Sequence, residues 1–170
     1  MYKSETFTTT KPALSAIALG SNLGDSRAIL EAALDKINKT ANLTIKACSS
    51  WYKTAPIGPA QPDFLNGCAI LEVTLSPHKL LETLLGIEQD FGRVRLEHWG
   101  PRTLDLDIIL FDNLILETPD LQIPHRLMRD RAFVLVPLAE IAPDWIEPVS
   151  GLTVSQLVQR LDCSEVRLIV

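Results

Sequence analysis

The chain has 170 residues, 46% of them hydrophobic and 22% charged, with a formal net charge of −5. This length suits one domain with a sizeable core, and the negative charge argues against nucleic acid or an anionic membrane as partner. No apolar stretch is long enough to span a membrane. Three widely spaced cysteines form no disulfide or zinc pattern, and we expect reduced core thiols in a cytoplasmic protein: Cys48, Cys68 and Cys163.

The amino-terminal residues 1–12 are polar and threonine-rich, and they lack the apolar run of a signal peptide. We expect a flexible tail there and a single domain over residues 13–170. The first element of that domain is an apolar run that predicts a strand over residues 14–19. The glycine-containing stretch 20–24 predicts the turn that follows.

A helix is expected next, capped by Asp25 or Ser26, with one apolar side made of Ile29, Leu30, Ala33, Leu34 and Ile37. Alternating apolar residues predict a second strand over residues 43–47. A proline-rich loop over 54–63 leads to a third strand around residues 66–75.

Ser76 and Pro77 are typical of a helix start, because the hydroxyl caps the first turn and proline fits the first helical position. Gly92 fits the end of that helix. The charged stretch 93–102 has no regular period and predicts a loop. The remaining expected elements are a strand over 104–111, a polar segment through 131, and helices over 132–141 and 154–161.

The expected order is therefore β-α-β-β-α-β, which is that of the ferredoxin-like split unit. It predicts an α+β fold in which helices cover one face of an antiparallel sheet. A carboxy-terminal helical extension would follow, and loops and this extension would occupy the other face. The fourth strand would then meet the proline-rich and arginine-rich loops at a cleft.

Asp105 and Asp107 are two carboxylates inside the apolar run that predicts the fourth strand. Side chains alternate between the faces of a strand, so both would point the same way, roughly 6–7 Å apart. Such a pair can hold one or two Mg²⁺ ions together with waters and phosphate oxygens. A buried ion network with arginines explains the pair equally well at this point.

Four residues of the loop support the metal and phosphate interpretation. Arg93, Arg95 and Arg102 can grip phosphate oxygens with their planar guanidinium groups. Trp99 needs something to pack against, which favours a loop that closes over a substrate. A solvated surface loop is the simpler alternative.

Several residues elsewhere could bind a flat heterocycle or a phosphate. Phe64 and Phe133 could sandwich a ring, and Asn66 could read an amide-like edge. His125, in a basic neighbourhood, could contact phosphate. Each of these residues is, alone, more often a core or turn residue.

One segment resembles the signature of the 6-hydroxymethyl-7,8-dihydropterin pyrophosphokinase family: Trp99-Gly100-Pro101-Arg102-Thr103-Leu104-Asp105-Leu106-Asp107-Ile108. The similarity runs from about residue 15 to about residue 148. It includes Gly20-Ser21-Asn22, Tyr52-Lys53-Thr54, Phe64-Leu65-Asn66, Gly92-Arg93-Val94-Arg95, Pro124-His125 and Arg131-Ala132-Phe133. Ala55 and Arg126 depart from the family pattern, where a proline and an aromatic residue are common.

The resemblance implies an enzyme that transfers diphosphate from ATP to the pterin's hydroxymethyl oxygen, releasing AMP, in folate biosynthesis. It implies a monomer with small-molecule partners and two Mg²⁺ ions held by Asp105 and Asp107. The implied catalytic arginines are Arg93, Arg95 and Arg102. The implied pterin site is Thr54, Ile57, Phe64, Asn66, Trp99 and Phe133. The implied ATP site is Glu88, Arg93, Trp99, Arg102, Ile108, His125 and Arg131.

Two other functions fit the same residues. A metal-dependent nucleotidyl transferase or cyclase also uses paired acids on such a sheet, but it releases pyrophosphate. A non-catalytic small-molecule sensor of the same fold would need no metal. The paired acids make the sensor the weaker alternative.

Overall fold

A computed structural model describes residues 11–56, 60–92 and 103–169. The main sheet contains β1 (Ala13–Ser21), β4 (Phe64–Val73) and β5 (Asp105–Phe111), and its strands follow the order β5-β1-β4-β3-β8. β2 also pairs with β4, beside β3, and every pairing is antiparallel. The bounds of the other strands are β2 (Leu43–Cys48), β3 (Tyr52–Thr54) and β8 (Arg167–Leu168).

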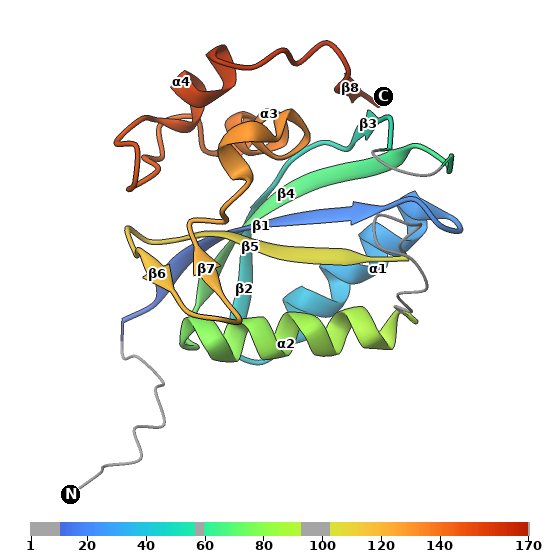
Figure 1. Cartoon of the computed structure of the whole chain (residues 1–170). Coiled ribbons are helices and arrows are strands. Elements are labelled where there is room, and N and C mark those ends of the chain that lie inside the picture. The colour runs from blue at the N-terminus through green and yellow to red at the C-terminus, as the bar shows by residue number, and fades with distance from the viewer. Residues whose placement is uncertain (1–10, 57–59, 93–102, 170) are drawn as a thin grey trace, which may run out of the picture.

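Two helices connect these strands by crossovers. α1 (Ser26–Lys39) joins β1 to β2, and α2 (Pro77–Asp90) joins β4 to β5. Each crossover skips one strand, because β4 lies between β1 and β2 and β1 lies between β4 and β5. Both helices lie on the same face of the sheet (Figure 1), so the prediction of an antiparallel α+β fold is confirmed.

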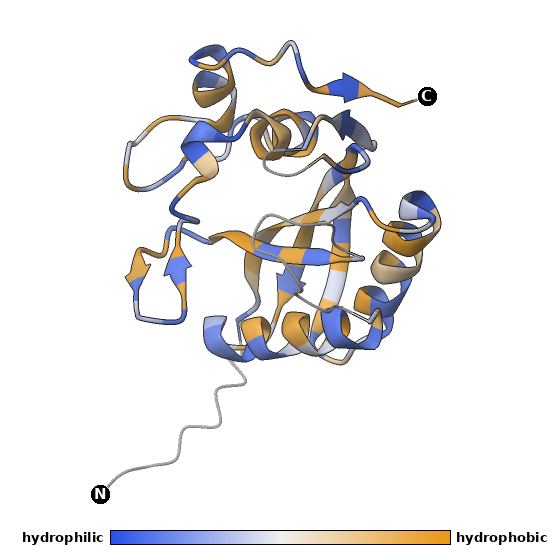
Figure 2. Ribbon diagram, turned by 45° about the vertical axis from the view of Figure 1, so that its right-hand side comes forward, coloured by the Kyte–Doolittle hydropathy of each residue, from blue (hydrophilic) through white to orange (hydrophobic). Residues whose placement is uncertain are grey.

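The helix starts agree with the caps expected from the sequence. The Asp25 carboxylate accepts the N–H of Ala28 at 3.2 Å, and the Ser76 hydroxyl accepts the N–H of Lys79 at 3.3 Å. One side of each helix is hydrophobic and faces the sheet (Figure 2). The buried helix residues are Leu30, Ala33 and Ile37 of α1 and Leu80, Leu84 and Ile87 of α2.

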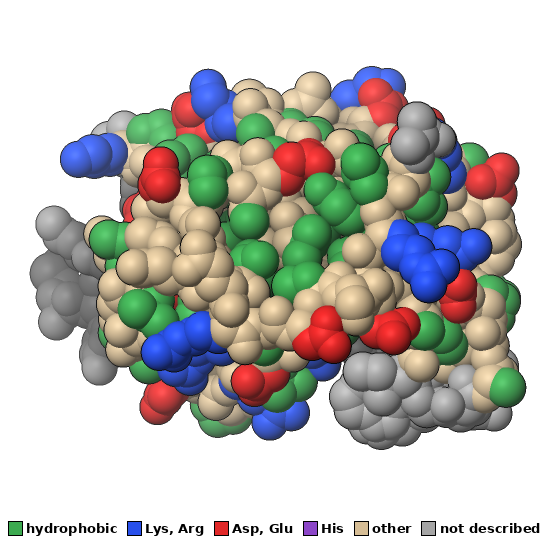
Figure 3. Space-filling model, turned by 90° about the horizontal axis from the view of Figure 1, so that it is seen from above, with side chains coloured by type: hydrophobic (Ala, Val, Ile, Leu, Met, Phe, Trp, Pro, Cys, Tyr) green, Lys and Arg blue, Asp and Glu red, His purple; other side chains and the backbone are tan. Residues whose placement is uncertain are grey.

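The carboxy-terminal segment covers part of the opposite face, as expected. α3 (Ala132–Ile141) and α4 (Val154–Gln159) build a second core there with side chains from β1, β4 and β5. Figure 3 shows this side of the molecule, where hydrophobic side chains gather in the middle and charged ones lie mostly toward the rim. Hydrophobic side chains therefore pack on both faces of the sheet, and Arg131, at the start of α3, lies within electrostatic range of Asp105 and Asp107 of β5.

Some boundaries differ from the sequence expectations. β1 continues through Gly20, which was expected in a turn, because Gly20 still pairs with both neighbouring strands. β4 begins at Phe64 and ends at Val73, two residues earlier at each end than expected. β3 and β8 were not expected, nor were the hairpin of β6 (Leu116–Glu117) with β7 (Gln122–Ile123) and the 3-10 helix η1 (Met128–Asp130).

The cysteine expectation is correct for only one residue. Cys68 is buried, but Cys48 is exposed and Cys163 is half-buried, so they are not core thiols. None of the helices in the described ranges has the length and apolar character needed to cross a membrane. The predicted tail lies almost wholly outside the described residues and stays a prediction.

Candidate active site

Asp105 and Asp107 lie on β5 and share one face of the sheet. Their neighbours Leu106 and Ile108 are buried in the core beneath α1 and α2. Since side chains alternate along a strand, the two half-buried aspartates point to the opposite face, where α3 lies. The expectation that both carboxylates point the same way is confirmed.

Directly paired residues form a row across the sheet from Asp105 of β5 to Asn66 of β4. Gly20 of β1 pairs with Asp105 on one side and with Asn66 on the other, and Tyr52 of β3 pairs with Asn66. Directly opposed residues point to the same face. Because neighbouring strands lie about 4.8 Å apart, Asp105 and Asn66 are separated by roughly 10 Å, with only a glycine between them.

Gly20 keeps that middle position open. A Cβ atom there would lie 3.0 Å from Oδ1 of Asn66 and 4.0 Å from Cδ1 of Phe64. Asn66 and Phe64 therefore border the same small space above Gly20. A larger residue than glycine would fill the gap between the amide and the carboxylates.

Thr54 fixes the orientation of the Asn66 amide. Nδ2 of Asn66 donates to the Thr54 hydroxyl at 2.7 Å, and both residues are buried. This bond leaves Oδ1 directed toward the space above Gly20 as a hydrogen-bond acceptor. The structure thus brings together three of the residues expected to bind a pterin: Thr54, Phe64 and Asn66.

The start of α3 supplies a positive charge and an aromatic ring. The guanidinium of Arg131 lies 5.4 Å from the centre of the Phe133 ring, a cation–π contact. Burial lowers the pKa of Arg131, the charge of Asp107 raises it, Arg126 lowers it and Asp105 raises it. Arg131 stays charged and lies within electrostatic range of both aspartates.

His125 precedes this helix and is also close to Asp107. Burial lowers the pKa of His125, the Asp107 charge opposes that effect, and Arg131 and Arg126 lower the pKa further. Nδ1 accepts the N–H of Leu127 at 3.2 Å, so a neutral ring carries its proton on Nε2. The backbone N–H of His125 donates to Ile109 at 2.9 Å, which holds the residue against β5.

A groove runs along the outer edge of β5, between α2 and the β6–β7 hairpin. Leu81, Leu106 and Ile108 form an apolar part of its lining, while Asp107, His125 and Arg126 lie in its polar part. Ile108 and His125 were expected at an ATP site, and Arg126 was not. A groove with one apolar wall that ends at a carboxylate, an imidazole and a guanidinium suits a molecule with a flat ring and a charged tail.

Glu88 has a structural role that the sequence did not suggest. The residue is 1% exposed, and its carboxylate accepts the N–H of Leu106 at 2.8 Å. Leu106 lies between the two aspartates on an edge strand, so Glu88 holds that strand from α2. The expected contact of Glu88 with ATP stays a prediction.

Five expected site residues fall outside the described ranges: Ile57, Arg93, Arg95, Trp99 and Arg102. Within the described ranges, no three His, Cys, Asp or Glu side chains form a metal-binding cluster. Asp105 and Asp107 nevertheless fit Mg²⁺, which takes one or two carboxylates and completes its shell with water and phosphate.

Comparisons with known proteins show which family the chain resembles. A family model described as 7,8-dihydro-6-hydroxymethylpterin-pyrophosphokinase (HPPK) matches residues 16–143. A protein of Synechocystis sp. is 53% identical over 150 residues, which are 88% of this chain and 77% of that protein. One of Haemophilus influenzae is 47% identical over 153 residues, which are 89% of this chain and 96% of that protein. Both are named 2-amino-4-hydroxy-6-hydroxymethyldihydropteridine pyrophosphokinase.

Among solved structures, the wild-type HPPK-DHPS of Plasmodium falciparum superposes with a TM-score of 0.71 at 17% sequence identity. The match covers 92% of this chain and 42% of that chain, so this chain spans less than half of that longer protein. At this identity the likeness supports the fold alone.

Proposed function

Since this chain belongs to the 7,8-dihydro-6-hydroxymethylpterin-pyrophosphokinase family, we propose that the row Asp105–Gly20–Asn66 is its reaction centre. As a member of that family the chain is an ATP-using pyrophosphokinase of folate biosynthesis. In this proposal the pterin binds at the Asn66 end and the triphosphate of ATP binds at the Asp105 end. The hydroxymethyl oxygen then meets the β-phosphorus above Gly20. The observation that carries the proposal is the strand register, which places Asn66 and Asp105 on either side of Gly20 and so, by the usual strand spacing, roughly 10 Å apart.

On the pterin side, Asn66 offers a directed acceptor and Phe64 offers an aromatic surface. The bond from Asn66 to Thr54 holds the amide before the substrate arrives, so little ordering is required on binding. Phe133, which packs at the start of α3, would form the second wall. We expect a flat ring to stack between these aromatic residues, with its amide-like edge on Asn66.

On the nucleotide side, the groove along β5 would hold ATP. The apolar residues Leu81, Leu106 and Ile108 suit the adenine ring. His125, as a neutral ring with its proton on Nε2, can donate to a phosphate oxygen, and Arg131 can offset phosphate charge. Phosphate binding by Arg93, Arg95 and Arg102, which lie outside the described residues, stays a prediction.

Asp105 and Asp107 would hold two Mg²⁺ ions, which offset the charge of the triphosphate and orient the β-phosphorus. The chain's own contribution is to hold both reactants at fixed places on one rigid sheet. Such positioning converts a bimolecular encounter into a reaction between held groups.

The test is a product assay with ATP, Mg²⁺ and 6-hydroxymethyl-7,8-dihydropterin, in which AMP, ADP and pyrophosphate are resolved. The proposal predicts AMP that depends on the pterin and disappears when a chelator removes the metal. ADP would instead indicate monophosphoryl transfer. Pyrophosphate formed without the pterin would favour a nucleotidyl transferase or cyclase, and the absence of any nucleotide product would favour a sensor.

We also propose that the protein acts as a cytoplasmic monomer on small molecules. Its net charge of −5 supports this choice against nucleic acid and anionic membranes. Light scattering at working concentration would test the monomer, and a dimer mass would contradict it.

A further inference from the structure

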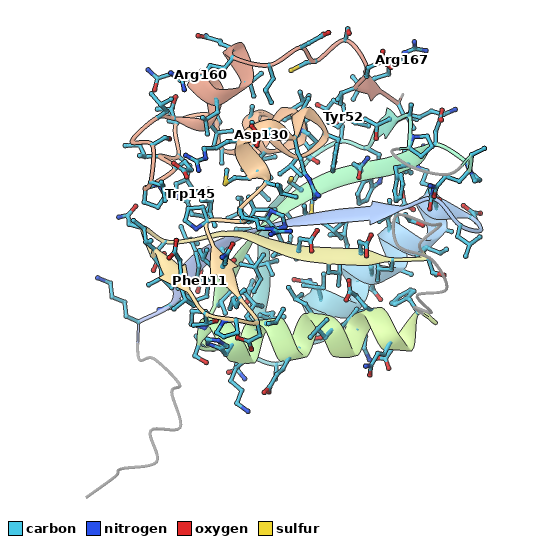
Figure 4. All side chains as sticks on the ribbon, viewed as in Figure 1. Tyr52, Phe111, Asp130, Trp145, Arg160 and Arg167 are labelled. Carbon is cyan, nitrogen blue, oxygen red and sulfur yellow. The ribbon has the colours of Figure 1, made fainter. Side chains whose placement is uncertain are left out.

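Tyr52 and Glu140 connect two parts of the molecule that carry different walls of the proposed pterin site. The Tyr52 hydroxyl donates to Oε1 of Glu140 at 2.7 Å, and the backbone N–H of Ser50 donates to Oε2 at 2.6 Å. Tyr52 belongs to β3 and Glu140 to the last turn of α3. Tyr52 lies where β3 faces α3 (Figure 4), so the carboxylate fastens the start of β3 to the helix.

Tyr52 and Glu140 each lie on the same side of their strand or helix as one residue of the proposed pterin site. Thr54 is two residues beyond Tyr52, so both point to the same face of β3, about 6–7 Å apart. Phe133 is seven residues before Glu140, which is close to two helical turns, so both lie on the same side of α3, about 10 Å apart. The link between Tyr52 and Glu140 therefore fixes how far Thr54 lies from Phe133.

The remaining contacts between α3 and the sheet are mostly apolar. Val134, Leu135 and Leu138 pack against Cys68, Ile70 and other residues of the second core. The Cys68 thiol also donates to the Val134 carbonyl oxygen at 3.4 Å, but a thiol is a weak donor. Apolar burial is not directional, so it restrains the position of the helix along the strands less sharply than it holds the helix on the sheet. Hydrogen bonds to a carboxylate have preferred distances and directions and supply that restraint.

The pKa shifts of the Tyr52 hydroxyl and the Glu140 carboxyl agree with a hydrogen bond between them. Partial burial would raise the pKa of Glu140, but the hydrogen bonds from Tyr52 and Ser50 outweigh it and lower the pKa. Burial, and then the bond to Glu140, raise the pKa of Tyr52 to about 12. At neutral pH the pair is thus a protonated phenol that donates to a charged carboxylate.

We propose that Tyr52 and Glu140 are positioning residues that set the gap between Thr54 and Phe133 and thereby the affinity for the flat-ring substrate. Neither residue touches the reacting atoms. The inference rests on the proposed function, because it assumes that the pterin binds between β3 and α3.

The test compares Tyr52→Phe, Glu140→Gln and Glu140→Ala with wild type. Phe keeps the ring and removes only the hydroxyl; Gln keeps the shape and one acceptor oxygen, and Ala removes both bonds. We expect the KM for the pterin to rise about five- to tenfold in Glu140→Ala, which loses both bonds, and less in the other two. The KM for ATP and kcat should stay within about twofold of wild type.

Ser150→Ala is the matched control. It also removes one hydroxyl that donates to a carboxylate, here at 2.6 Å to Glu147, beyond α3. A loss of stability alone would lower the unfolding temperature in the control and in the Tyr52 and Glu140 variants without raising the KM for the pterin. We expect the control to keep the wild-type KM for both substrates.

The inference is overturned if the Tyr52 and Glu140 variants keep the wild-type KM for the pterin at a temperature where they are fully folded. It is also overturned if the KM values for pterin and ATP rise together. A wild-type protein that forms no pterin-dependent AMP would contradict the proposed function itself, and the inference with it. The wild-type assay therefore separates the two failures.

Discussion

The carboxylate of Glu88 accepts the backbone N–H of Leu106 at 2.8 Å, directly between the two aspartates of β5. Over the described residues β5 lies at the edge of the sheet, so no described strand pairs with its outward N–H groups. The bond from α2 therefore supports the strand at the point where the proposed metal ligands lie.

Replacing Glu88 by Ala should destabilise the protein by about 1–3 kcal/mol, since a buried N–H loses its acceptor. Glu88→Gln keeps an oxygen acceptor and should cost less. Urea unfolding measures both free energies. A Glu88→Ala protein as stable as wild type would show that this bond does not support β5.

Replacing Asp107 by Asn should reduce kcat by at least about a hundredfold while the unfolding temperature stays close to that of wild type. The neutral amide is a poor ligand for Mg²⁺, whose charge stabilisation is worth several kcal/mol. Asp35→Asn is the control, because Asp35 lies exposed on α1 and pairs with Lys39 at the surface. Near-normal turnover in Asp107→Asn would refute the metal-ligand assignment.

Gly67 and Gly86 should respond to alanine in opposite directions. A Cβ atom at Gly67 would lie 2.5 Å from two ring carbons of Trp51, so Gly67→Ala should cost about 1–3 kcal/mol of stability by overpacking. At Gly86, inside α2, a Cβ atom meets nothing within 4 Å, and alanine should add up to about 1 kcal/mol. Equal unfolding free energies for the two variants would contradict the packing described for Trp51.

The contribution of Glu140 to stability should depend on pH when the pH is below the ordinary pKa of this carboxyl group. The folded state lowers the pKa of Glu140 from 4.5, so the unfolded chain takes up the proton first as pH falls. The stabilisation is therefore fully present above pH 4.5 and is lost as pH falls through the folded pKa. The difference in unfolding free energy between wild type and Glu140→Gln should shrink as the pH falls from 7 to 3. A difference that stays constant over this range would contradict the lowered pKa.

Part of the site could be predicted from local patterns, and part could not. The alternation around Asp105 and Asp107 defines their shared face without any tertiary information, and the caps at Asp25 and Ser76 are local too. β3 has only three residues and forms no periodic pattern, so its pairing with β4 was not predictable. The bond between Tyr52 and Glu140 joins residues 88 apart in the sequence and depends on how α3 docks.

The positions of Gly20 and Glu88 in the fold also depend on contacts between distant parts of the chain, so their roles were not predictable from local patterns. Gly20 looks like a turn residue in the sequence, and only the strand register shows that it separates Asp105 from Asn66. Glu88 looks like a polar residue on an amphipathic helix, and only the packing of α2 beside β5 shows that its carboxylate is buried.

The group that this family transfers to the pterin is a diphosphate rather than a single phosphoryl group. We would follow the phosphorus NMR spectrum of the pterin product formed from ATP and Mg²⁺ by the wild-type protein. We expect two mutually coupled phosphorus signals on the pterin and one AMP released for each product molecule. A single phosphorus signal on the pterin, with ADP as the other product, would contradict this expectation.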